Sequence, residues 1–141
     1  MEGRSNHFEG LSTPFRTFVA LFNDGHFWES HEVLEKPWRE YRSNFYKGLI
    51  IYASAFVHAQ RGNPRGVRKQ MVKAAGYLEE YRPFYLGVDV ERLLMHLHRC
   101  LAWVQGSEPP TGEALASSFP YDTIVLDPSR VRGDEVELSG G

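Results

Sequence analysis

The sequence contains very little cysteine, since Cys100 is the only one in 141 residues. A single cysteine excludes an intrachain disulfide and a zinc site built from several thiolates. Apolar runs are also short, and none approaches the roughly 20 residues that a membrane helix needs. The chain does not open with a cationic start followed by an apolar run, so no secretory signal is expected and the cytoplasm is the predicted location.

A strong charge of either sign is missing too, because the formal net charge is -2. The chain therefore has no global attraction for nucleic acid or for an anionic membrane, and neither is favoured as a partner. Three common signatures are absent as well: the G-x-S-x-G elbow, the Walker loop and the glycine-rich dinucleotide fingerprint. These absences remove the usual sequence evidence for an α/β-hydrolase and for a dinucleotide-binding enzyme.

What the sequence does contain is the composition of an ordinary globular protein, with 42% hydrophobic and 24% charged residues. Its length favours one domain. Residues 1–12 are polar and glycine-bearing and are expected to be flexible. Residues 13–106 are predicted to form a helical bundle domain. Residues 107–141, where proline, glycine and serine increase, are predicted to form an extended, partly mobile tail.

Apolar periodicity predicts helices at residues 14–23, 27–41, 45–61, 65–81 and 90–105, with Thr13 as the N-cap of the first. The third is apolar almost all the way round, which is typical of a helix in the middle of a bundle. Pro37 removes a backbone hydrogen bond from the second, so a kink or tight turn is expected there. In the tail, only Thr123–Leu126 has a strand-like pattern. The predicted fold class is all-α, a compact bundle of about five helices with an irregular C-terminal tail.

The densest polar cluster lies on the second predicted helix, around His31, Glu32 and Glu35. His31 and Glu35 are four residues apart and are therefore neighbours on one helical face. Residues 31–35 have the pattern H-E-x-x-E, which resembles the zinc-protease motif H-E-x-x-H with a glutamate in place of the second histidine. His58, on the apolar third helix, would approach this pair if the two helices pack antiparallel.

Two histidines and one carboxylate can hold a divalent metal such as iron or zinc. The sharper hypothesis is therefore a metal site with His31, Glu35 and His58 as ligands. Glu32 would then act as general base on a metal-bound water, as in metal-assisted hydrolysis.

The alternative is that His31 and Glu35 form a hydrogen-bonded pair that organises the core. Trp28 and Trp38 would line the same pocket and add indole donors to a satisfied polar network. This interpretation is favoured, because buried ionisable groups indicate function only in a minority of cases.

A second feature is a run of cations, Arg61, Arg65, Arg68, Lys69 and Lys73, with no acidic residue among them. Arg65, Arg68 and Lys69 fall near a helix N-terminus, where the helix dipole disfavours cations. Free backbone N–H groups and arginines together can bind a phosphate, so these three residues are candidates for an anion site. The alternative, which the sequence favours, is a solvated helix face.

Two segments together resemble a known family. Residues 22–39 have the sequence FNDGHFWESHEVLEKPWR, and the second segment has KGLI at residues 47–50 and HAQRGNPRG at residues 58–66. They resemble the two motifs of the bacterial and archaeal family known as domain of unknown function 309, over roughly residues 15–105. The resemblance implies a compact helical bundle without a settled biochemical activity. The matching motif positions are Glu29, His31, Glu32, Glu35, Trp38, His58 and the turn from Gly62 to Gly66, whereas Pro37 departs from the pattern.

Three functional hypotheses remain open. The first is a metal- or small-ligand-binding module with a His/Glu pocket between the second and third helices, with a metal-dependent hydrolase as its catalytic form. The second is a structural or interaction domain whose partner is another protein or a second copy of the chain, as in a homo-oligomer. The third is a domain that binds an anion or nucleic acid through Arg65, Arg68 and Lys69.

Overall fold

The computed structural model describes residues 11–106 and 108–140. This part of the chain is predominantly helical and contains one two-stranded antiparallel hairpin. The bundle helices are α1 (Thr13–Asn23), α2 (Phe27–Tyr41), α3 (Asn44–Gln60), α4 (Pro64–Leu78) and α5 (Val90–Val104). The remaining elements are the 3-10 helices η2 (Glu79–Tyr81) and η3 (Pro128–Arg130), the strands β1 (Phe84–Tyr85) and β2 (Val88–Asp89), and the short helices α6 (Gly112–Ser118) and α7 (Val136–Gly140).

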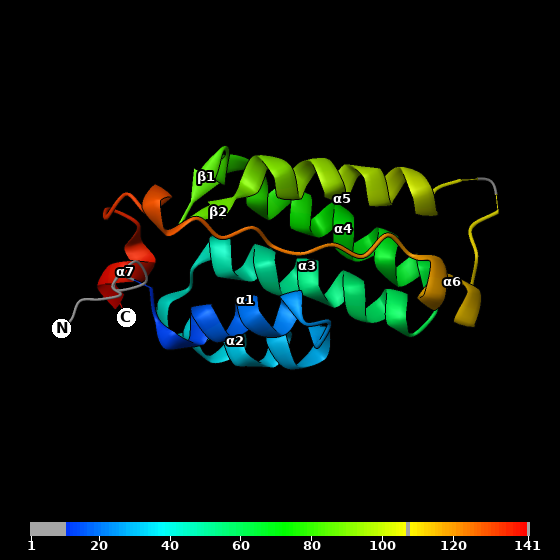
Figure 1. Ribbon diagram of the computed structural model, residues 1–141, viewed down its shortest axis with the longest axis horizontal. Coiled ribbons are helices and arrows are strands. Elements are labelled where there is room, and N and C mark those ends of the chain that lie inside the picture. The colour runs from blue at the N-terminus through cyan, green and yellow to red at the C-terminus, as the bar shows by residue number, and fades with distance from the viewer. Residues whose placement is uncertain (1–10, 107, 141) are drawn as a thin grey trace.

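The five long helices pack in chain order, each against the next, with α3 in the middle (Figure 1). Side-chain caps begin four of them, because the N-cap side chain accepts the backbone N–H of the residue three positions later: Ser12 caps α1, Ser43 caps α3, Asn63 caps α4 and Asp89 caps α5. Almost every side chain of α3 is buried, as its apolar sequence predicts. The expected all-α bundle is therefore confirmed.

α2 runs through Pro37 without interruption and ends only at Arg42, which adopts a left-handed conformation with φ 55°. The expected tight turn at Pro37 is therefore wrong, and the buried proline ring is part of the helix's inner face. The flexibility expected for the N-terminus falls almost entirely on residues 1–10, which lie outside the described residues. Among the residues described, no helix combines the length and the apolar character needed to cross a membrane.

The tail after Gly106 is more ordered than expected, because it contains α6, η3 and α7. Between α6 and η3 it crosses the face of the bundle that looks toward the viewer in Figure 1. There Asn23 at the end of α1 bonds both backbone groups of Ile124, with Nδ2 to O 3.0 Å and Oδ1 to N 2.6 Å. Leu126 pairs with Val88 of β2, so the predicted strand-like segment Thr123–Leu126 bridges α1 and the hairpin that leads into α5.

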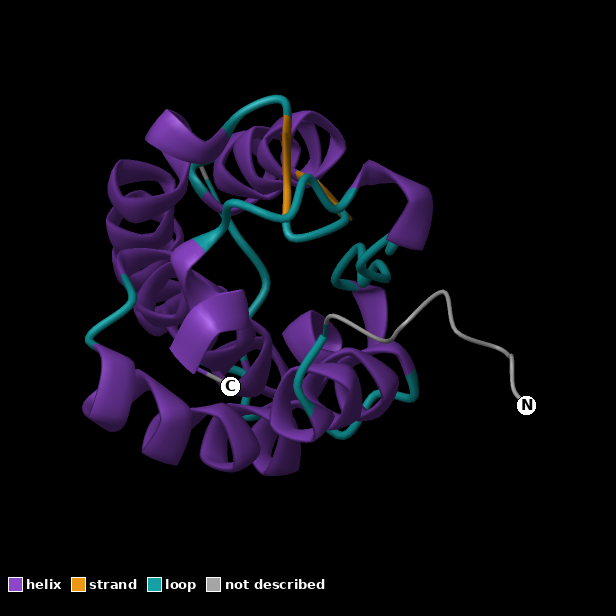
Figure 2. Cartoon of the chain, turned by 90° about the vertical axis from the view of Figure 1, so that its left-hand side faces the viewer, coloured by secondary structure: helices purple, strands orange, loops and turns teal. Residues whose placement is uncertain are grey.

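Two buried carboxylates hold the end of the tail in place by accepting hydrogen bonds. Glu135 accepts hydrogen bonds from the backbone N–H groups of Leu86, Arg132 and Gly133. Burial alone would raise the pKa of Glu135, but these N–H donors outweigh it and hold the pKa below 4.5. Glu137 accepts from the Ser43 hydroxyl and from Tyr85 at 2.7 Å. Figure 2 looks onto this end of the molecule, with α7 toward the viewer.

The centre of the core is a cluster of aromatic rings around Phe56 of α3. Its ring centroid lies 4.9 Å from those of Phe22 in α1 and Phe27 in α2. The tail contributes Phe119, at 5.5 Å, and Tyr121, at 6.0 Å. Because these rings come from three helices and the tail, Phe56 ties together parts of the chain that are distant in sequence.

Candidate functional site

Between its exposed end residues, Asn44 and Gln60, α3 reaches solvent along a narrow strip formed by Lys47, Ser54 and His58. The three residues are seven and four positions apart, which places them on one face of the helix. All three are half-buried, because α2 borders the strip on one side and α4 on the other. The sequence of α3 is apolar almost all the way round, and this strip holds most of its few polar side chains.

The α2 border carries the two tryptophans. Trp28, at the start of α2, lies beside Arg61 at the end of α3, with the guanidinium carbon 5.3 Å from the ring centroid. Trp38, near the other end of α2, has the Lys47 ammonium 4.2 Å from its centroid. The start of one helix thus meets the end of the other, so α2 and α3 are antiparallel, as the metal hypothesis required. Each indole packs against a cation instead of donating to the His/Glu pair.

The α4 border approaches α3 very closely. Gln70 donates to the Ser54 hydroxyl across the strip at 3.0 Å. Near the start of α4, a Cβ added to Gly66 would lie only 2.3 Å from His58 Nδ1, so glycine leaves the space that the imidazole occupies. The same nitrogen lies 3.2 Å from the Asn63 side-chain amide. The turn from Gly62 to Gly66 therefore holds the His58 ring against α4.

The expected metal ligands are not assembled. His31 Nε2 is 3.9 Å from Glu35 Oε2, but the other oxygen of Glu35 forms an ion pair with Arg39 at 3.1 Å. His58 is engaged by Asn63 on the opposite border of the strip. Within residues 11–106 and 108–140, no group of three or more His, Cys, Asp or Glu side chains could hold a metal ion. Glu32, the expected base, is exposed.

The His31–Glu35 pair also differs from the expected core network. Both side chains are partly exposed at the edge of α2, at 19% and 36%. The His31 ring stacks on Trp28 with a centroid distance of 5.3 Å, and its Nδ1 is buried without a hydrogen-bond partner. The pair therefore lies on the rim of the α3 strip. The helical spacing correctly predicted that the two residues are neighbours, but they lie too far from the core to organise it.

The basic residues come together in a groove between the end of α3 and the first half of α4. The groove has a volume of about 310 Å³. We call it the basic groove; its lining residues are His58, Asn63, Arg65, Gly66, Lys69, Gln70 and Lys73. Arg65 and Lys69 were expected at an anion site, whereas Arg68, expected with them, points elsewhere and Lys73 takes its place.

The charged side chains that line the basic groove are all positive. No carboxylate lines it, and none of Arg65, Lys69 and Lys73 has an ion pair with an acidic residue in the described part of the chain. The pKa of His58 is lowered from 6.5, first by burial and then by the positive charges of Arg61 and Lys69. His58 is consequently neutral at pH 7, and its pKa reports a positive potential in the groove.

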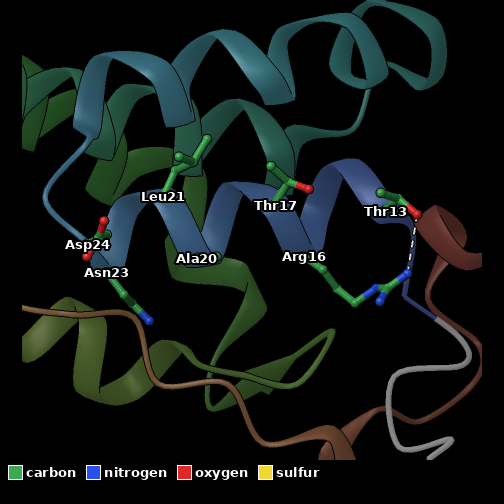
Figure 3. Close-up of a pocket in the computed structure, with 7 residues that line it drawn as sticks. All are labelled: Thr13, Arg16, Thr17, Ala20, Leu21, Asn23 and Asp24. Atoms are coloured by element: carbon green, nitrogen blue, oxygen red, sulfur yellow. Dashed lines mark hydrogen bonds between the residues drawn. The ribbon is translucent and has the colours of Figure 1, made fainter.

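A larger hollow, of about 610 Å³, lies on the outer face of α1 (Figure 3). Its polar groups are spread along the helix, with Thr13 and Arg16 at one end and Asn23 and Asp24 at the other. Arg16 is hydrogen-bonded to Thr13 at 3.2 Å. Because these groups do not converge on one point, the hollow offers a bound ligand fewer simultaneous polar contacts than the smaller basic groove does.

One arrangement was missed by the sequence analysis. Cys100 Sγ lies 3.3 Å from His96 Nε2, and His96 Nδ1 lies 3.6 Å from Asp122, as in a Cys–His–Asp triad. The four-residue spacing of His96 and Cys100 was the available signal, whereas Asp122 comes from the tail and gave none. His96 Nε2 must carry its proton, because it donates to the Pro120 carbonyl at 2.7 Å.

This geometry does not make Cys100 a nucleophile. A protonated Nε2 cannot accept the thiol proton, and burial raises the pKa of the Cys100 thiol to about 12, with Asp122 acting in the same direction. A thiol that stays protonated near neutral pH is neither reactive nor a metal ligand. Cys100 is therefore a buried structural residue.

Comparison with curated proteins finds no match. A family comparison does find one, and it covers α1, α2, α3 and the first half of α4, the segment that supplies both borders of the α3 strip and most of the basic groove. Residues 15–70 match the family described as Domain of unknown function (DUF309).

Proposed function

We propose that this protein is a helical-bundle binding domain whose basic groove holds the phosphate group of a small anionic ligand. The observation that carries the proposal is the convergence of Arg65, Lys69 and Lys73 on one concave site without a described carboxylate partner. These residues are spaced four apart along α4, so their side chains lie on the same face of the helix.

The arrangement is costly unless an anion is bound. Like charges four residues apart on a helix repel one another. Arg65 also lies in the first turn of α4, where the helix dipole disfavours a cation. A phosphate in the groove would reverse both effects, because its oxygens accept charge-assisted hydrogen bonds from the same side chains.

The size of the groove favours a small molecule. Ligand sites in proteins have volumes of roughly 300–1,000 Å³, and the basic groove, at about 310 Å³, is at the lower end of that range. It accommodates a phosphate and a small adjoining group. A metal ion is not proposed here, since the groove offers one imidazole and otherwise cations and amides.

Reversing one charge in the groove tests the proposal. The Lys69→Glu variant is expected to weaken the binding of inorganic pyrophosphate by about tenfold or more, because a charge-assisted hydrogen bond is lost and a repulsion gained. Affinity should be measured by isothermal titration calorimetry at about 50 mM and about 200 mM salt, and the wild-type affinity should fall as salt increases.

The matched control is Lys36→Glu, which makes the same change in net charge at an exposed position on α2 away from the groove. Its effect is expected to stay below about twofold, because solvent and salt screen distant charges. Equal losses in the two variants, or no pyrophosphate binding to the wild type at low salt, would show that the basic groove is not the site.

The pH dependence of sulfate binding provides a second test. His58 has a pKa below 6.5, so it is neutral above that pH and gains a positive charge as the pH falls through its pKa. Sulfate keeps its double negative charge over this interval, so its affinity should rise at low pH by about fivefold, equivalent to about 1 kcal/mol. In the His58→Gln variant the affinity should not change with pH, and a rise of the same size there would exclude His58 as the source.

A further inference from the structure

We propose that the ligand of the basic groove is a nucleoside phosphate, with its base stacked beside Trp28. This inference rests on the proposed anion-binding function and adds the chemical class of the ligand. It starts from the position of Trp28, which is 45% exposed although it is one of the largest apolar side chains of the protein.

Arg61 links this indole to the basic groove. Its guanidinium lies over the Trp28 ring, with Cζ 5.3 Å from the ring centroid, and its charge also lowers the pKa of His58, which lines the groove. Arg61 is one helical turn beyond His58, at the end of α3. The exposed aromatic ring, the guanidinium and the groove therefore follow one another around the end of α3.

A ligand that uses all three features must carry a flat aromatic group next to a phosphate. Nucleobases stack on indole rings and on guanidinium planes, and both surfaces are present here. The His31 ring, parallel to Trp28 within 14°, supports the indole from α2. Sugar phosphates and inorganic phosphates would fill the groove but leave Trp28 in water, so a nucleoside phosphate suits the site better than either.

The test compares ADP with inorganic pyrophosphate, because both present a diphosphate and only ADP has a base. In the wild-type protein ADP should bind about tenfold tighter by isothermal titration calorimetry. The Trp28→Ala variant should lose that advantage while its affinity for pyrophosphate stays unchanged, and Trp28→Phe should keep most of it. The control is Trp38→Ala, which changes the tryptophan at the other end of α2 and should preserve the difference.

The outcomes separate the two proposals. If neither compound binds, the anion-binding function itself is wrong. If pyrophosphate binds and ADP binds no more tightly, or if Trp28→Ala leaves the ADP advantage intact, the basic groove stands and the nucleoside inference falls. A single-stranded oligonucleotide that binds far more tightly than ADP would also overturn it, in favour of a polymeric ligand. Circular dichroism of each variant, matching the wild type, ensures that the differences arise from binding.

Discussion

Replacing Phe56 with alanine is expected to lower the free energy of unfolding by about 3–5 kcal/mol. The Phe56 side chain is fully buried, and its ring contacts rings from α1, α2 and the tail. Removing it takes away the transfer free energy of the ring and leaves a cavity, which the surrounding aromatic side chains can fill only in part because helices on several sides hold them. The measurement is urea denaturation followed by far-ultraviolet circular dichroism.

The control for this experiment is Met95→Ala on α5. The Met95 side chain is 60% exposed, so its removal should change the free energy of unfolding by no more than about 0.5 kcal/mol. If Phe56→Ala costs less than about 1 kcal/mol, the aromatic cluster around Phe56 does not hold the tail and the three helices together as described.

The second large effect is expected at Gly62, in the turn between α3 and α4. Its φ of +73° lies in the left-handed region, where alanine costs about 1–2 kcal/mol. A Cβ there would also lie 2.3 Å from the Gly112 Cα, in the backbone at the start of α6. Since Gly112 donates its N–H to the Gly62 carbonyl at 2.9 Å, the clash would break this docking contact. Gly62→Ala should therefore lose at least about 2 kcal/mol in a thermal or urea denaturation.

Gly76→Ala provides the matched control, because it makes the same chemical change inside α4. Nothing lies within 4 Å of a Cβ at that position, and its φ is not in the left-handed region. Alanine is the better helix former by about 1 kcal/mol, so this variant should be more stable than the wild type. Opposite signs for the two substitutions are the expected result, and equal signs would contradict the role assigned to Gly62.

The bundle was predictable because the sequence signals that specify each helix lie within or next to that helix. Apolar spacing placed the five long helices to within a few residues, and the nearly continuous apolar sequence of α3 predicted its central position. The path of the tail could not be predicted in the same way. It depends on pairs such as Asn23 with Ile124, which are 101 residues apart and follow no periodic pattern.

The candidate site was predictable in part. The cluster of cations at Arg65 and Lys69 was visible as a run of charge, and helical spacing would have added Lys73 and removed Arg68. In the described structure His58 is not grouped with His31, for a reason that sequence does not reveal. The direction of the His58 ring is set by the missing side chain of Gly66 and by the Asn63 amide, both of which lie on α4 or at its start.

The tail that bridges α1 and the α5 hairpin has a consequence for synthesis. A chain made from its N-terminus completes α1, α2 and α3 well before Phe119, Tyr121 and Ile124 are translated. Until then Phe27 and Phe56 lack the ring contacts that Phe119 and Tyr121 provide, and such incompletely covered apolar surface is what chaperones bind and what aggregates. The nascent bundle therefore reaches its closed form only after Ile124 has left the ribosome.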